Sequence, residues 1–218
     1  MPKTKTLVKI CGLTSEKQAL QIAKFGADAI GIISVIDSPR FISDEIKKKI
    51  FNTLESFYPN IERVTVVKNC PVDIMVKNFL ECPSETIIQL HGDENLDYCK
   101  RIRQELPNVG LWKAFRIKTK KDIDKIKPYE NFIDAILLDS WNKDTYGGSG
   151  QKIKSNHLKN IKFTKPWWLA GGISTEWIDE IINEIKPYGI DVSSSVEIKP
   201  GVKDLKEAER LIKYLKKH

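Results

Sequence analysis

Several chemically active side chains of this sequence follow short apolar runs. They are a cysteine, an arginine, a glutamine close to a histidine, and an aspartate: Cys11, Arg40, Gln89, His91 and Asp139. A thiol, an imidazole and a carboxyl group are side chains that proteins use for proton transfer and nucleophilic attack. A lone cysteine is usually a small buried residue, and a lone aspartate after a strand is usually a helix cap. Any chemistry therefore depends on whether the fold brings these side chains together.

Three clusters of glycine and serine form a second group of candidate residues. They are "YGGSGQ", "AGGIS" and "DVSSSVE", which contain Gly148, Gly150, Gly171, Gly172, Ser194 and Ser195. Such segments let backbone N–H groups and hydroxyls approach an anion closely, although glycines also serve ordinary tight turns. The clusters predict a phosphate-binding site.

Short β-branched runs alternate with amphipathic segments along the whole chain. The predicted strands cover residues 7–11, 29–33, 62–67, 86–90, 110–115, 135–139, 166–170 and 189–193. Helices are expected between most of them and over 204–217, with Thr14 or Ser15 capping the first helix and a weak, short helix at 147–160. Each unit averages about 27 residues, which is typical of a strand, a loop and a helix.

Eight such units predict an α/β fold, a single-domain (β/α)8 TIM barrel over residues 1–218. An open doubly wound sheet shares the local pattern. The count of eight favours the barrel, and no Gly-x-Gly-x-x-Gly follows the first strand. Active sites of such barrels lie at the carboxyl ends of the strands, where all the candidate side chains are expected.

Composition narrows the classes of protein further. No segment approaches the roughly 18 unbroken apolar residues of a membrane span, and "MPKTKTLVKI" is not a secretory signal, so we expect a cytoplasmic protein that does not bind membranes. The four cysteines lack the spacing of a metal site or a disulfide framework. The net charge of +7 comes from scattered lysines, which indicates a solvated surface without a nucleic-acid partner.

An ordered set of motifs resembles a known enzyme family. The motifs are "VKICGLT", "SPR", "QLHGDE", "LLDS" followed by "GGSGQ", "LAGGIS" and "DVSSSVEIKPGVKD". They look like phosphoribosylanthranilate isomerase, a (β/α)8 enzyme of tryptophan biosynthesis. The resemblance implies an Amadori rearrangement of N-(5-phosphoribosyl)anthranilate to 1-(2-carboxyphenylamino)-1-deoxyribulose 5-phosphate, with no cofactor and no metal. It leaves the choice between a monomer and a homodimer open.

The resemblance also implies a role for each matching residue. The cysteine of "KICG", Cys11, would be the general base, and the aspartate of "LLDS", Asp139, the general acid. Arg40, Gln89 and His91 would contact the small phosphosugar substrate, while the glycine and serine loops hold its phosphate. The family usually has glycine where this chain has Ser195, so Ser195 would be strained if the position needs a positive φ angle.

Alternation along residues 7–11 places Lys9 on the same strand face as Cys11, so we expect its charge to help the thiol ionise. Closure of the barrel would place Asp191 beside Lys9 and pair the two charges. Asp139 would keep its proton near neutral pH, which makes the acid and the base a reverse-protonated pair.

Other functions are consistent with parts of the pattern. Cys11 could act as a covalent nucleophile with His91 as its base. Another phosphosugar barrel enzyme is the closest rival, although an epimerase would need metal ligands that three histidines do not supply. A non-catalytic barrel that binds a phosphorylated metabolite, or a nucleic-acid-binding domain suggested by the net charge alone, completes the alternatives.

Overall fold

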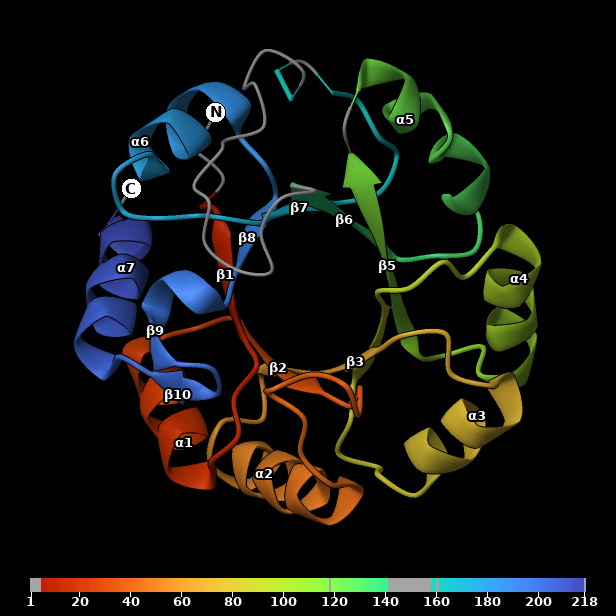
Figure 1. Cartoon of the computed structure of the whole chain (residues 1–218), viewed down its shortest axis with the longest axis horizontal. Coiled ribbons are helices and arrows are strands. Elements are labelled where there is room, and N and C mark those ends of the chain that lie inside the picture. The colour runs from red at the N-terminus through yellow and green to blue at the C-terminus, as the bar shows by residue number, and fades with distance from the viewer. Residues whose placement is uncertain (1–4, 118, 141–157, 160, 218) are drawn as a thin grey trace.

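Eight parallel strands form a closed barrel, in which each strand pairs with the next and β8 pairs back with β1. The computed structural model describes residues 5–117, 119–140, 158, 159 and 161–217. Figure 1 looks down the barrel and shows the helices as a ring around the strands. The strands are β1 (Leu7–Cys11), β2 (Ala29–Ile33), β3 (Glu62–Val67), β4 (Ile87–Leu90), β5 (Gly110–Ile117), β6 (Ala135–Ser140), β7 (Trp167–Ala170) and β8 (Gly189–Val192).

Helices follow most strands and cover the outside of the barrel. The α-helices are α1 (Glu16–Phe25), α2 (Asp44–Phe57), α3 (Val72–Leu80), α4 (Leu96–Glu105), α5 (Lys120–Asp124), α6 (Ile178–Glu180) and α7 (Leu205–Lys217). Shorter elements are the 3-10 helices η1 (Lys127–Tyr129) and η4 (Ser194–Val196), the π-helix η3 (Ile181–Ile185) and the strands β9 (Glu197–Lys199) and β10 (Val202–Lys203). The part of the chain that the structure describes has no helix long and apolar enough to cross a bilayer.

The predicted barrel is confirmed, and the open sheet is excluded because β1 pairs with both β2 and β8. The first three strands have their predicted bounds, while β5 continues to Ile117. The short helix expected at 147–160 falls almost wholly outside the described residues. That residues 1–218 make up one domain stays a prediction.

The cap expected for the first helix differs in detail. Ser15 occupies the N-cap position of α1, but its side chain makes no capping hydrogen bond. The Thr14 hydroxyl instead donates to the carbonyl of Gly201, 2.6 Å away, and so ties the start of α1 to the segment between β9 and β10. This contact joins the loops after the first and last barrel strands.

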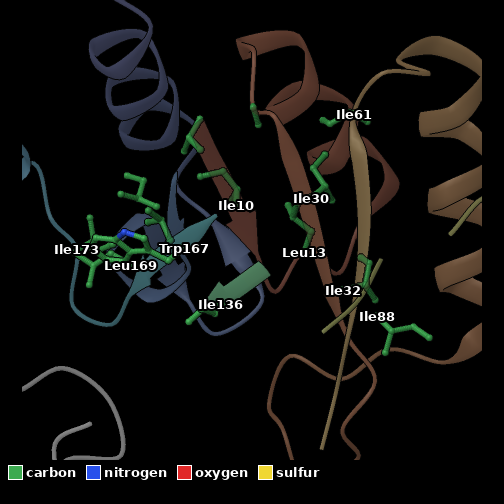
Figure 2. Packing of buried hydrophobic residues seen from close by; sticks show 14 of the residues in the cluster. Ile10, Leu13, Ile30, Ile32, Ile61, Ile88, Ile136, Trp167, Leu169 and Ile173 are labelled. Carbon is green, nitrogen blue, oxygen red and sulfur yellow. The ribbon is translucent and has the colours of Figure 1, made fainter. Parts of the chain in front are cut away.

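Alternation along each strand separates two apolar layers. Side chains directed outward belong to one large cluster with buried side chains of the helices, and Figure 2 labels four of them, Ile10, Ile30, Ile88 and Leu169. Side chains directed inward form a smaller cluster inside the barrel: Ala29, Val64, Ile87, Trp112, Ala114, Ala135, Leu137, Trp168 and Ala170, with Leu7 packed against it. The barrel interior is therefore a packed core, and a site can form only above it.

Two adjacent tryptophans of β7 illustrate the separation of the outer and inner apolar layers. Trp167 belongs to the outer layer, while Trp168 turns inward and packs against Trp112 with the ring centroids 4.7 Å apart. The neighbouring position in β8 is Gly189, and a Cβ atom there would lie 2.5 Å from the Trp168 ring. The large indole inside the barrel therefore requires a residue without a side chain beside it.

We predict that Gly189→Ala lowers the free energy of unfolding by about 1–3 kcal/mol, because overpacking forces neighbouring groups out of their minima. Urea denaturation measures this change. In a Trp168→Leu background the same substitution should cost clearly less, since the ring that the new methyl group meets is gone. An equal cost in both backgrounds would contradict the steric explanation.

Candidate active site

A cavity of about 200 Å³ opens at the carboxyl ends of the barrel strands. Nine of the side chains and glycines predicted for the site line it: Cys11, Gln89, His91, Asp139, Gly171, Gly172, Asp191, Ser194 and Ser195. They come from five different strands or the loops that follow them. Cys11 and Asp139, the two residues with the predicted proton-transfer roles, therefore share one cavity.

Strand β1 places Lys9 and Cys11 on its inward face, as alternation predicts. Lys9 is fully buried, and Cys11 is the last residue of the strand. Their neighbour in β2 is Gly31, where a Cβ atom would lie 2.6 Å from the Cys11 sulfur and 3.0 Å from Cε of Lys9. The glycine leaves room for the thiol and the lysine to lie side by side.

The predicted pairing of Lys9 with Asp191 is present. The two residues are in register between β1 and β8, and Nζ of Lys9 lies 2.8 Å from Oδ2 of Asp191. Lys9 Nζ also donates to Oε1 of Gln89 in β4, 2.9 Å away. The other carboxylate oxygen of Asp191, Oδ1, is buried and has no hydrogen-bond partner among the described residues.

A line of hydrogen bonds continues from Gln89 to Asp139. Gln89 Nε2 lies 3.1 Å from Nδ1 of His91, and Nε2 of His91 lies 3.1 Å from Oδ2 of Asp139. Together with the contacts of Lys9, these bonds connect Asp191 in β8 to Asp139 in β6 by way of β1 and β4. The five side chains form one connected polar layer above the apolar interior.

Burial raises the pKa of the Cys11 thiol above its ordinary value, because a thiolate loses its hydration inside the protein. Lys9 and Lys203 act in the opposite direction, and Asp191 adds to the rise. Lys9 thus favours the thiolate, as predicted, but burial has the larger effect and the pKa of the thiol is raised overall.

The neighbours of Lys9 stabilise its charged form. Burial alone would lower the pKa of Lys9, but the attraction of Asp191 and of the Cys11 thiolate raises it above its ordinary value. These two neighbours therefore favour the ammonium form of Lys9.

The loops after β7 and β8 form the part of the cavity that is predicted to bind phosphate. Gly171 and Gly172 have φ angles of 88° and 60°, and a Cβ atom at Gly172 would meet nothing within 4 Å. Ser194 and Ser195 lie in η4, directly after β8. The condition under which Ser195 would be strained is not met, because the only non-glycine residues with positive φ in the described segments are Asn69 and Lys186.

Arg40 does not line the cavity and lies beside it, above Gly12. A Cβ atom on Gly12 would come within 2.6 Å of Cδ of Arg40. Two nitrogens of the guanidinium bind the carboxylate of Glu197, with Nη2 lying 2.6 Å from Oε2. The same carboxylate accepts from Nζ of Lys203 at 2.7 Å, and Lys203 also donates to the carbonyl of Ser193.

Sequence reasoning missed Glu197, Lys203, Ser193 and Gly31. Glu197 is almost fully buried between two cations, and burial would raise its pKa, but Arg40 and Lys203 bring it below the ordinary value. The motif "DVSSSVEIKPGVKD" contains three of these residues, yet nothing in its spacing shows which side chains meet. Gly148 and Gly150, the remaining predicted phosphate-binding residues, lie outside the described residues.

No group of three or more metal-ligating side chains is found in the described segments. Among the described residues, the cavity offers a buried thiol, a carboxyl group hydrogen-bonded to an imidazole, and loops rich in glycine and serine.

Comparisons with known proteins agree on one family. The family model of N-(5'phosphoribosyl)anthranilate (PRA) isomerase matches residues 8–214. An N-(5'-phosphoribosyl)anthranilate isomerase from Thermosynechococcus vestitus is 38% identical over 208 residues, which cover 95% of this chain and 89% of that protein.

Two solved structures are similar over nearly the whole chain. Phosphoribosyl anthranilate isomerase from Thermotoga maritima has a TM-score of 0.87 and 30% identity, covering 98% of this chain and 100% of that one. A phosphoribosyl anthranilate isomerase in complex with reduced 1-(o-carboxyphenylamino)-1-deoxyribulose 5-phosphate has a TM-score of 0.80 and 28% identity, with coverage of 98% and 100%.

We predict that Lys9→Met destabilises the protein by about 3–5 kcal/mol, because it leaves Asp191 buried without its cation. Chemical denaturation measures the change. Asp191→Asn in the Lys9→Met background should restore part of the loss, since the uncompensated charge is then removed.

The matched control is Lys49→Met, which removes an exposed lysine paired with Glu16 and should change stability by less than about 1 kcal/mol. Similar losses from both substitutions would show that the buried pair contributes no more than a surface pair.

Proposed function

This chain belongs to the N-(5'-phosphoribosyl)anthranilate isomerase family, and we propose that it converts N-(5'-phosphoribosyl)anthranilate to 1-(2-carboxyphenylamino)-1-deoxyribulose 5-phosphate by acid–base catalysis. The observation that carries the proposal is the shared cavity of Cys11 and Asp139. The chain would thereby serve tryptophan biosynthesis, and its partner would be a small phosphosugar.

Asp139 is the proposed general acid. Its proton goes to the ring oxygen of the ribose as the bond from that oxygen to C1 breaks, and the nitrogen lone pair forms the C1=N iminium. The thiolate of Cys11 then removes the proton from C2, and the electron pair of that C–H bond forms the C1=C2 double bond of an enolamine. Transfer of the C2 hydroxyl proton to C1 completes the ketone.

The protonation states needed are the reverse of those that the ordinary pKa values favour. A thiolate and a carboxylic acid must be present together, although burial raises the pKa of the thiol. The raised pKa makes the thiolate scarce, but it also makes the thiolate a stronger base.

Substrate binding would use the rest of the cavity wall. The loops after β7 and β8 offer glycine backbone and serine hydroxyls for the phosphate. Oδ1 of Asp191 is a buried acceptor without a partner in the described residues, which suits a hydroxyl of the sugar. Arg40, held by Glu197 beside the cavity, is the proposed contact for a negative group of the substrate.

The direct test follows the loss of fluorescence of freshly prepared phosphoribosylanthranilate in the presence of EDTA. A catalytic barrel should remove the substrate well above the rate of the buffer control, with or without the chelator. A barrel that only binds phosphorylated metabolites would leave the rate at that of the buffer, which would refute the proposed activity.

We predict that Asp139→Asn and Cys11→Ser each lower kcat by roughly 10²-fold or more, the usual size of an acid–base contribution. The residual activity of Asp139→Asn should rise about tenfold per pH unit below the raised pKa of the thiol, because only ionisation of Cys11 then limits the rate. Initial rates between neutral and alkaline pH measure this slope.

The double variant Cys11→Ser/Asp139→Asn is the control, and its residual rate should not rise with pH in this way. A pH-independent residual rate in Asp139→Asn would remove Cys11 from the role of base, and near-normal turnover in either single variant would remove that residue from the mechanism.

A cytoplasmic location, one domain and a homodimer complete the proposal. All four cysteines are free, as thiols are in a reducing compartment. Light scattering tests the association: a homodimer gives about twice the chain mass of 25.0 kDa, and a species at the chain mass contradicts it.

A further inference from the structure

The side chain of Gln89 is fully buried between a lysine and a histidine. A glutamine amide carries an oxygen that only accepts hydrogen bonds and an NH₂ group that only donates them. The ammonium group of Lys9 has no acceptor, so the atom of Gln89 that lies 2.9 Å from it must be the oxygen. This contact fixes which way the amide faces.

The orientation of Gln89 determines the tautomer of His91. With its oxygen on Lys9, Gln89 directs its NH₂ group at Nδ1 of His91, 3.1 Å away. Nδ1 must then be the unprotonated nitrogen, and the proton of the neutral imidazole lies on Nε2. Nε2 is the nitrogen that faces Oδ2 of Asp139 at 3.1 Å. His91 therefore donates to Asp139.

We propose that Gln89 is a positioning residue that holds His91 in the Nε2–H tautomer, so that Oδ2 of Asp139 is always an acceptor and the catalytic proton resides on Oδ1. This inference rests on the proposed function for the role of Asp139, but the tautomer does not depend on any reaction. Lys9 then supports both ends of the site, the thiol by its charge and the acid through Gln89 and His91.

The reverse arrangement would conflict with every neighbour. A flipped Gln89 would direct NH₂ at the ammonium of Lys9 and its oxygen at Nδ1, which would then need a proton. Nε2 would become an acceptor facing a carboxylate oxygen, and the carboxyl proton would be drawn onto Oδ2, into the bond with His91. The proton would then be directed away from the substrate.

Nitrogen NMR tests the tautomer in the intact protein. The chain has three histidines, and a His91→Gln variant identifies the signals of His91 in a ¹⁵N-labelled sample. At about pH 8, above the ordinary imidazole pKa near ~6.5, wild type should show one tautomer with Nδ1 unprotonated. A signal for protonated Nδ1, or an exchanging mixture of the two tautomers, would overturn the proposal.

Gln89→Glu tests the link from Gln89 to His91. A carboxylate beside Nδ1 accepts a proton there, so the Nδ1 signal should move to that of a protonated nitrogen. Gln104→Glu on the exposed face of α4 is the matched control and should leave the His91 signals unchanged. An unaltered His91 spectrum in Gln89→Glu would refute the control of the tautomer by Gln89.

Measurements of kcat and KM distinguish a positioning role of Gln89 from a direct contact between Gln89 and the substrate. Gln89→Glu and the nearly isosteric Gln89→Met should lower kcat at least tenfold and change KM less than about threefold, while Gln104→Glu retains wild-type values. His91→Gln, whose NH₂ group can replace Nε2–H, should retain more activity than His91→Asn, whose shorter side chain cannot reach Asp139. A rise in KM with unchanged kcat would instead make Gln89 a substrate contact.

Failure of the proposed function and failure of the positioning role of Gln89 give different results. If wild type shows the Nε2–H tautomer and Gln89→Glu shifts it, but the protein does not consume phosphoribosylanthranilate, the proposed function is wrong and the tautomer control remains. If the protein isomerises the substrate but the spectrum of His91 ignores Gln89, the positioning role is wrong.

Discussion

The buried ammonium group of Lys9 is the constraint on which the rest of the site depends. A charge inside a packed barrel is costly unless it is paired and fully hydrogen-bonded. Lys9 achieves this with Asp191 from β8 and Gln89 from β4, so three strands contribute to one interaction. Because the partners come from opposite sides of the closed sheet, the ammonium group can be satisfied only when the barrel is complete. The fold and the site therefore form together.

The same charge bears on the proposed role of Cys11 as a base, because the thiol lies in an apolar place. Burial makes the thiolate scarce by raising the pKa of Cys11, and Lys9 and Lys203 limit that rise. With no cation nearby the thiol would stay neutral, and in a fully hydrated place the thiolate would be a weaker base. Gly31 contributes to this balance between burial and positive charge, because any side chain there would push the sulfur of Cys11 away from Lys9.

The sequence was informative wherever the backbone alone decides the geometry. Strand alternation correctly placed Lys9 and Cys11 on one face, and the order of strands in a closed barrel correctly placed Asp191 beside Lys9. Side-chain contacts between loops have no such periodicity, so the carboxylate of Glu197 between Arg40 and Lys203 could not be foreseen. Ser195 shows a further limit, since the residue type usual in a family does not reveal the φ angle of a position, and the backbone of η4 needs no positive φ there.

The two sides of the cavity manage charge in different ways, and this difference fits a reaction that moves protons across a sugar. On the thiol side, Lys9 and Lys203 are both cations near Cys11, and each is matched by a carboxylate, Asp191 or Glu197. At Asp139 the hydrogen-bond partner is the imidazole of His91, which in the proposed Nε2–H tautomer donates to Oδ2. A nearby cation favours ionisation, whereas a neutral donor supports a carboxyl group without holding it ionised as strongly. With two cations near the proposed base and an imidazole donor at the proposed acid, the cavity limits the rise in the pKa of Cys11 and supplies the carboxyl group of Asp139 with a hydrogen bond.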